Sequence, residues 1–243
     1  NKKKIIVEAD SQHFINQNIW TNNKLSILDF GGKIASDLGE GRFPLLHLND
    51  SWISFVDFNL KKIDFKNISL SQVVTYPLSQ LFEPFFVPAR VMLSDSLALL
   101  SSQNSFGEEN IVSFDFNKKE KKLIKKFSKG THIDLCETSD QIVLSEFSDK
   151  IIQITSWKKN ESIEKGKTIY KDSVNLGYGL ECYNNKIYFI AYPIKKPEQT
   201  AVIELTLDGK KKALTAPGKF SQFSIMDERL ILNANGAIYY ISL

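Results

Sequence analysis

Four basic residues provide the strongest candidate for a binding site in this sequence. Arg42, His132 and Lys219 each lie eight residues before one of six regularly spaced turns, and Arg90 lies close to a fourth such position. Guanidinium groups present forked donors that match the oxygens of carboxylates and phosphates. We therefore expect these four side chains to converge in one cavity and bind an anion. The alternative is that they only solvate the ends of loops.

Tyr178 and Tyr192 are expected to flank this anion site. Both lie in neighbouring loops, and a tyrosine supplies an aromatic face together with a hydroxyl donor. Ring faces beside positive charges suit an anionic small molecule or a glycan. Binding should weaken with salt, because exposed charges are screened over about 8 Å at physiological ionic strength.

The longest loop, residues 75–88, carries three phenylalanines that could anchor a protein partner. Phe82, Phe85 and Phe86 stand among three prolines, which stiffen the loop and lower the entropy cost of presenting aromatic side chains. An exposed patch of this kind would dock another chain. The same side chains could instead fold down and complete the core.

Residues that would hold a metal or act as a nucleophile are scattered. His13, His47 and His132 share no ligand-like spacing, and neither Cys-x-x-Cys nor His-x-x-x-His occurs. Phosphate-loop, dinucleotide-binding and Gly-x-Ser-x-Gly motifs are absent as well. Glu83 and Asp172 are the only acids near the basic positions. We therefore expect no bound metal, no cofactor and no catalytic residue. These observations favour a protein that is not an enzyme.

The two cysteines, Cys136 and Cys182, lie 46 residues apart, which is close to one repeat of the chain. One interpretation is a disulfide that joins neighbouring repeats. A disulfide tolerates roughly 4.4–6.8 Å between α-carbons, and equivalent points on adjacent repeats are expected to lie farther apart. We therefore expect two reduced, buried thiols.

The elements that must position these residues repeat along the whole chain. Six short apolar runs each end in an acidic or amide turn, and a second apolar run follows at once. The turns recur every 40 to 45 residues, with four β-type runs in each period. A fixed period of this size is typical of a β-propeller, so the predicted fold class is all-β. The six turns are Asp10-Ser11, Asp50-Ser51, Asp95-Ser96, Asp140-Gln141, Asn185-Lys186 and Asp227-Glu228.

We predict a single domain, residues 1–243, with six four-stranded blades. Asp208-Gly209, after an apolar run, is the strongest hairpin signal. The last blade has only three runs, so it is either incomplete or closed by the N-terminus. Lys2 to Val7 could move across, or a strand before Asn1 could cover the open edge. The approximate blade boundaries are 3–40, 43–76, 88–127, 131–170, 176–216 and 220–243.

Two segments carry a resemblance to known propellers. Residues 25–39 (LSILDFGGKIASDLG) and 202–210 (VIELTLDGK) resemble the third-strand, turn and fourth-strand segment of six-bladed propellers of the NHL and TolB-like type. They are also similar to uncharacterised secreted or lipoprotein propellers from the Bacteroidetes. The resemblance implies a six-bladed fold and an extracytoplasmic location, at the cell surface or in the periplasm. A cytoplasmic location stays open.

The amino-acid composition argues against some classes of binding partner. The net charge of +3 is small, lysine carries most of the positive charge, and the arginines stand only at 42, 90 and 229. A nucleic-acid binder typically has a strongly basic composition with clustered arginine, so no nucleic-acid partner is expected. No apolar run is long enough for a transmembrane segment. The first residue is Asn rather than Met, which suggests a removed leader or a lipid anchor upstream of residue 1.

These features favour a non-enzymatic, extracytoplasmic binding or interaction module. Its surface for an anionic ligand, a glycan or a protein partner would lie on the propeller face that carries the long loop. One alternative is a propeller-type hydrolase or lactonase with its site at the central channel. Another is a scaffold domain that docks a second chain through the 75–88 loop.

Overall fold

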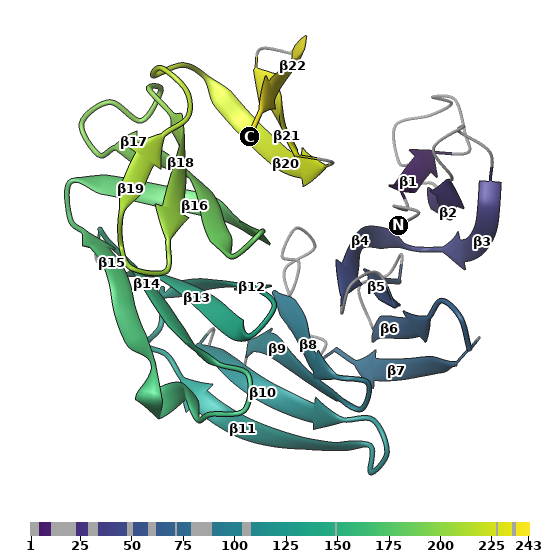
Figure 1. Ribbon diagram of the computed structural model, residues 1–243. Helices are drawn as coiled ribbons and strands as arrows, with labels where there is room; N and C mark the ends of the chain where they lie inside the picture. The colour runs from purple at the N-terminus through teal and green to yellow at the C-terminus, as the bar shows by residue number, and fades with distance from the viewer. Residues whose placement is uncertain are drawn as a thin grey trace. The chain divides into compact units, whose positions relative to one another are not determined.

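The computed structural model describes residues 5–10, 23–28, 34–47, 51–57, 62–70, 72–78, 89–103, 108–148, 150–226, 228–234 and 237–243. Within these ranges the chain forms β-strands and one short 3₁₀-helix, η1 (Ile163–Lys165). The strands, labelled in Figure 1, make antiparallel sheets, and the fold is that of a β-propeller. The predicted all-β propeller class is therefore confirmed.

The chain divides into two compact units, which are described separately. Unit 1 comprises Asn1–Pro88, Ser94–Leu97 and Phe114–Glu120. Unit 2 comprises Ala89–Leu93, Ala98–Ser113 and Lys121–Leu243. The single domain and its six boundaries stay a prediction.

Unit 1 contains the first two sheets, and in each the strands follow one another in chain order. The first sheet consists of β1 (Ile5–Asp10), β2 (Asn23–Leu28) and β3 (Ile34–Glu40). The second consists of β4 (Arg42–His47), β5 (Trp52–Val56), β6 (Lys62–Asn67) and β7 (Val73–Pro77).

The remaining four sheets lie mainly in unit 2 and also follow chain order. The third consists of β8 (Arg90–Ser94), β9 (Leu97–Gln103), β10 (Glu109–Asp115) and β11 (Glu120–Lys126). The fourth consists of β12 (His132–Glu137), β13 (Gln141–Ser148), β14 (Ile151–Lys158) and β15 (Lys167–Asp172). The fifth consists of β16 (Asn175–Tyr183), β17 (Lys186–Pro193), β18 (Ala201–Thr206) and β19 (Lys211–Ala213). The last consists of β20 (Phe220–Met226), β21 (Arg229–Ala234) and β22 (Ala237–Ser242).

Among the residues that the structure describes there are five blades, so the predicted count of six is wrong. The sequence period marks one sheet per repeat, but the first and last sheets have three strands each, whereas the other four sheets have four. An apolar run in the sequence predicts a strand, but it does not show whether enough strands pair with one another to complete a blade. The N-terminal strand β1 pairs with β2, so Ile5–Asp10 belong to the first sheet. Residues 1–4 lie outside the described part of the chain.

The predicted turns that the structure describes do separate the first two strands of their sheets. Asp95 lies between β8 and β9, and Asp140 immediately precedes β13. Asn184 and Asn185 join β16 to β17 with φ of 47° and 59°. Two consecutive positive φ angles suit a tight hairpin turn, and asparagine tolerates them better than most residues. Gly209, with φ of 88°, likewise lies between β18 and β19, which confirms the strongest hairpin signal.

Each unit has its own apolar core, built from alternating side chains of the sheets. In unit 1, Trp52 and Phe65 pack on Phe116, with ring centroids 5.7 and 5.1 Å away. The indole of Trp52 donates a hydrogen bond to Asp95 at 2.7 Å. Unit 2 is filled by strand residues of adjacent sheets, including the fully buried Ile142 and Ile187. These cores hold the first strands β8, β12, β16 and β20, which carry the site.

Candidate functional site

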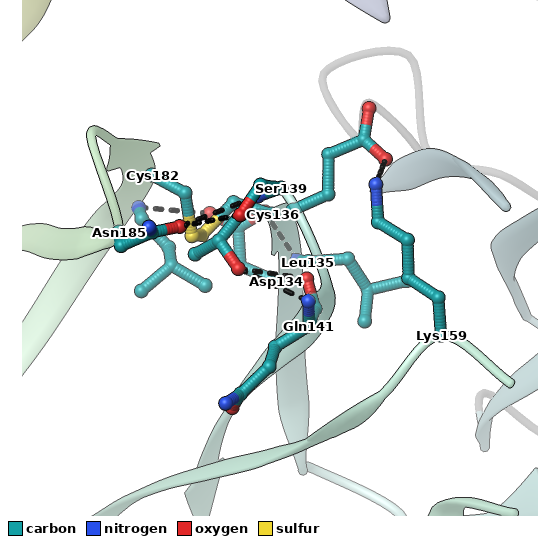
Figure 2. Close-up of a disulfide and its surroundings, with 11 residues drawn as sticks. Asp134, Leu135, Cys136, Ser139, Gln141, Lys159, Cys182 and Asn185 are labelled. Atoms are coloured by element: carbon teal, nitrogen blue, oxygen red, sulfur yellow. Dashed lines mark hydrogen bonds and ion pairs between the residues drawn. A yellow bond between two sulfur atoms is a disulfide. The ribbon is translucent and has the colours of Figure 1, made fainter. Parts of the chain in front are cut away.

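A disulfide joins the first strands of two adjacent sheets in unit 2. Cys136 of β12 is bonded to Cys182 of β16, as Figure 2 shows, and the α-carbons lie 5.5 Å apart. The expectation of two reduced thiols is therefore wrong. It assumed that equivalent points on adjacent repeats lie too far apart, but β12 and β16 run side by side here. Their separation falls inside the range that a disulfide tolerates.

Two hydrogen bonds lie on either side of this disulfide, one between β12 and β16 and one between the turns that follow them. The backbone N–H of Leu180 donates to Asp134 Oδ2 at 3.1 Å. The hydroxyl of Ser139 donates to Asn185 Oδ1 at 2.8 Å (Figure 2). The covalent bond therefore lies within a short, continuous seam between the two sheets.

The same kind of contact recurs at the next pair of sheets. Glu181 of β16 accepts the backbone N–H of Ile225 in β20 at 2.9 Å, much as Asp134 accepts that of Leu180. A carboxylate on one first strand thus satisfies a donor of the following first strand. Buried backbone donors need such partners, so both acids stabilise the junctions between sheets.

Burial changes the protonation of these acids and of a neighbouring glutamate. It raises the pKa of Asp134 to about 6 and the pKa values of Glu109 and Glu181 to about 7. The negative charge of Asp134 raises the pKa values of both glutamates further. We call Glu109, Asp134 and Glu181 the acid cluster. Groups that titrate near neutral pH in a shielded setting are typical of functional sites, and also of structural ion networks.

Arg90 supplies the positive charge that partly balances the acid cluster. It begins β8 and is only 1% exposed. Burial lowers the pKa of Arg90 to about 9, while the charge of Asp134 opposes that shift. Arg90 in turn lowers the pKa of Asp134. The guanidinium of Arg90 and the carboxylate of Asp134 therefore stabilise each other's charged form.

The acid cluster makes the stability of unit 2 depend on pH. A raised pKa means that the folded state binds protons more tightly than the unfolded state, so this contribution is present at acidic pH and is lost as pH rises through about 6 to 7. We expect the free energy of unfolding to fall by several kcal/mol between roughly pH 5 and pH 8. Urea unfolding at several pH values measures this, with Glu181→Gln reducing the slope. A free energy that rises over the same interval contradicts the assignment.

His132 stands at the edge of the acid cluster and not within it. Its side chain is 70% exposed, and Nδ1 lies 3.6 Å from Glu109 Oε1. The ring stacks on Phe147, with a centroid distance of 6.4 Å and an interplanar angle of 13°. The imidazole therefore connects a buried glutamate to the surface.

Two of the predicted binding residues, Tyr178 and Tyr192, lie side by side in unit 2. Tyr178 of β16 is 42% exposed, and its ring centroid lies 5.9 Å from that of Tyr192 in β17. The Tyr178 hydroxyl donates to the carbonyl oxygen of Phe220 at 3.0 Å. Lys219, which is exposed, directly precedes that residue. We call Tyr178, Tyr192 and Lys219 the tyrosine surface.

A β-bulge sets the direction of these side chains. The pairing of β16 with β17 shifts register between Tyr178 and Glu181, and Gly179 within this step has φ of 69°. Glycine adopts such a φ without strain, and an extra residue in one strand turns the side chains that follow it. The bulge thus lies between Tyr178, on the tyrosine surface, and Glu181, in the acid cluster.

The full predicted anion site is not tested by the structure. Arg42 begins β4, but its side chain lies outside the described part, and Arg42 and Arg90 belong to different units. The convergence of Arg42, Arg90, His132 and Lys219 therefore stays a prediction. Phe82, Phe85 and Phe86 also lie outside the described residues.

Sequence reasoning missed the acid cluster and named Asp172 and Glu83 instead. A signal was present, because Asp134 and Glu181 stand just before Cys136 and Cys182, about one repeat apart. Asp134 lies two residues before its cysteine, whereas Glu181 lies one residue before its own. This difference of one residue matches the bulge in β16, and it made the two acids hard to recognise as equivalent positions of the repeat. Glu109 begins a third strand, β10, and no local pattern distinguishes it.

A small cleft of about 190 Å³ lies between the fourth and fifth sheets of unit 2. Its lining includes Tyr170, Asn175, Gln199 and Lys211. Lys211 Nζ lies 5.5 Å from the centroid of the Tyr170 ring, and the Tyr170 hydroxyl donates to Asp172 at 2.8 Å. These polar groups largely satisfy one another, and the volume is below the roughly 300 Å³ at which ligand pockets begin. The cleft is therefore a weaker candidate than the tyrosine surface.

The described residues were compared with the requirements of a metal site and of a membrane-spanning helix. No group of three or more His, Cys, Asp or Glu side chains there is arranged to hold a metal ion. Among the same residues, no helix has both the length and the apolar character needed to cross a bilayer.

Several solved structures share this fold at low sequence identity. TolB from Acinetobacter baumannii has a TM-score of 0.62 at 14% identity, covering 88% of this chain and 57% of TolB. An oligogalacturonate lyase in complex with manganese has a TM-score of 0.60 at 11% identity, covering 90% of this chain and 68% of the lyase. A gluconolactonase from Xanthomonas campestris has a TM-score of 0.58 at 9% identity, with coverages of 91% and 82%. No protein-family model and no curated protein matches the sequence.

These similarities establish the fold alone. The neighbours comprise a TolB, a lyase and a lactonase, so the shared architecture carries unlike functions. The chain also spans little more than half the length of that TolB. Function has to be argued from the residues of this chain.

Proposed function

We propose that this chain is a non-enzymatic, extracytoplasmic binding module whose ligand contacts the tyrosine surface. The observation that carries the proposal is the fixed and exposed Tyr178, held against Tyr192 and hydrogen-bonded to the Phe220 carbonyl beside Lys219. A tyrosine held in place offers a large contact area at little cost in conformational entropy. Ring faces next to an ammonium group suit an anionic sugar or a similar small acid.

Two members of the acid cluster, Asp134 and Glu181, support a binding role over catalysis. Asp134 and Glu181 accept backbone donors of the next sheet, so their carboxylates already have structural partners. A general acid or base must instead reach a proton of the substrate.

The disulfide supports the proposed extracytoplasmic location. Disulfides persist in oxidising compartments and are rare where glutathione and thioredoxin keep thiols reduced. The bond between Cys136 and Cys182 joins two sheets and has no neighbouring thiol in this sequence with which to exchange. It therefore fits a structural role in a secreted, surface or periplasmic protein.

A thermal-shift screen against glucuronate, galacturonate, inorganic phosphate and neutral glucose tests the binding proposal. We expect a sugar acid to raise the melting temperature and glucose to have no effect. Tyr178→Ala should weaken binding by about tenfold, because it removes a central aromatic contact. Lys219→Ala should weaken binding and reduce its salt dependence.

Two matched variants serve as controls for that screen. Tyr178→Phe keeps the ring and loses only the hydroxyl, so it should retain most of the affinity. Lys196→Ala removes another exposed lysine of unit 2 and should bind as the wild type does. The proposal fails if no acidic probe binds, or if binding is unchanged in Tyr178→Ala.

A propeller-type hydrolase or lactonase is the second candidate, and one observation favours it. The pKa values of Glu109, Asp134 and Glu181 lie near neutrality, as those of catalytic acids and bases often do. Hydrolysis of gluconolactone above the uncatalysed rate, abolished in Glu181→Gln, would establish this candidate in place of the first. Docking of another chain through residues 75–88 also remains a proposal.

A further inference from the structure

We infer that the cleft between the fourth and fifth sheets of unit 2 binds a small aromatic carboxylic acid. The cleft has a volume of about 190 Å³. Pockets for drug-sized ligands begin at roughly 300 Å³, so this space suits a single ring with a short acidic arm. No residue of the tyrosine surface lines the cleft, so this site is distinct from the one that carries the proposed function.

Rings and small apolar side chains form most of the cleft wall. Tyr170 comes from β15 of the fourth sheet, Pro193 from β17, and Pro217 from the segment after β19. Ala191 and Ala201 stand opposite one another on the paired strands β17 and β18, and two alanines fill little of the space there. A flat ring packs against such a wall with offset or edge contacts to the tyrosine, and it loses little conformational freedom on binding.

Backbone hydrogen bonds fix the segment that carries Pro217. The N–H of Gly218 donates to the carbonyl oxygen of Thr200 at 2.8 Å, and the N–H of Thr200 donates to that of Gly218 at 2.7 Å. Three residues before Pro217, the N–H of Leu214 donates to the carbonyl oxygen of Val202 at 2.9 Å. This wall of the cleft is therefore held against β18, and a ligand does not have to order it.

Lys211 supplies the positive charge that selects an acid. Its Nζ lies 5.5 Å from the centroid of the Tyr170 ring, and its side chain lines the cleft. Within the described part of the chain, no carboxylate lies within ion-pair distance of this ammonium group, whereas Lys210 pairs with Asp208 at 2.8 Å. A ligand carboxylate would give Lys211 the kind of partner that its neighbour already has.

Asp172 holds Tyr170 in position and has no capacity left for a cationic ligand. One oxygen accepts the Tyr170 hydroxyl at 2.8 Å and Nδ2 of Asn175 at 3.0 Å. The other accepts the backbone N–H groups of Val174 and Asn175, at 2.7 and 3.0 Å. A carboxylate has about four lone-pair positions, and these four donors occupy them. Since Lys211 also repels cations, the charges around the cleft favour an anion.

Titration of the isotope-labelled full chain with phenylacetate, followed by NMR, tests the inference. We expect the amide signals of Asn175, Gln199 and Lys211 to shift, with a dissociation constant on the order of 0.1–1 mM for a ligand of this size. Phenylacetamide lacks the charge and hexanoate lacks the ring, so each should bind at least about tenfold more weakly.

Two variants and a matched control locate the binding. Lys211→Ala, at an exposed side chain, should weaken binding by about tenfold and remove its salt dependence. Ala201→Leu should abolish binding, because the larger side chain fills the cleft. Lys212→Ala should bind as the wild type does, since the adjacent exposed lysine lies on the opposite face of β19 and does not line the cleft.

Four results would overturn the inference. They are no binding of phenylacetate up to roughly 10 mM, signal shifts confined to the tyrosine surface, binding of phenylacetamide or hexanoate as tight as that of phenylacetate, and unchanged affinity in Lys211→Ala.

Discussion

Replacing both cysteines, Cys136→Ala with Cys182→Ala, should lower the free energy of unfolding of unit 2 by about 2–5 kcal/mol. The bond closes a loop of 46 residues, and a crosslink of that span restricts the unfolded chain strongly. It also holds β12 and β16 together next to the hydrogen bond from Leu180 to Asp134. Urea unfolding under oxidising conditions measures the change.

Two controls separate the crosslink from simple side-chain loss. Reduction of the wild type should produce nearly the same decrease, whereas reductant should have no effect on the double variant. The mass of the denatured, unreduced wild type should be two hydrogens below that of the reduced chain. Two free thiols in protein prepared under oxidising conditions would show that the bond does not form.

Arg90→Met should destabilise unit 2 by about 3–5 kcal/mol. Arg90 is 1% exposed, and its charge lowers the pKa of Asp134, so methionine would leave a shielded carboxylate without its positive neighbour. Removing a positive charge that balances a buried carboxylate costs far more than removing an exposed charge. Chemical denaturation near neutral pH, where Asp134 is largely ionised, gives the largest effect.

An exposed arginine provides the matched control. Arg229→Met in β21 makes the same chemical change at the surface and should alter the free energy of unfolding by less than about 0.5 kcal/mol. Adding Asp134→Asn to Arg90→Met should recover part of the loss, since asparagine keeps an oxygen acceptor without the charge. Equal effects of the two arginine substitutions, or no recovery in the double variant, would show that Arg90 does not stabilise unit 2 by balancing the charge of Asp134.

The sequence was sufficient to predict the class of fold and the turns that the structure describes. Turns such as those at Asp95 and Asn185 follow local rules, because a few residues decide whether a chain can reverse. The blade count was not predictable in the same way. Whether a third strand such as β22 gains a fourth depends on pairing between distant segments, and apolar alternation reports only that a strand exists.

The predicted anion site stays a prediction, and what the sequence missed has physical causes. Tyr178 and Tyr192 lie next to one another because β16 pairs with β17. The disulfide was missed because its formation depends on the separation of two first strands, which sequence spacing does not give. The acid cluster was missed because burial, and not residue type, makes Asp134 unusual.

Hydrogen exchange with and without a saturating sugar acid from the screen tests the proposed function most directly. Binding at the tyrosine surface should slow exchange at residues 177–179 and 219–221, and Tyr178→Ala should abolish that protection. Amides next to the acid cluster, at Leu135 and Leu180, should be unaffected, because their donors already bond to Asp134. Protection confined to the acid cluster, or protection that survives Tyr178→Ala, would contradict a binding module that uses the tyrosine surface.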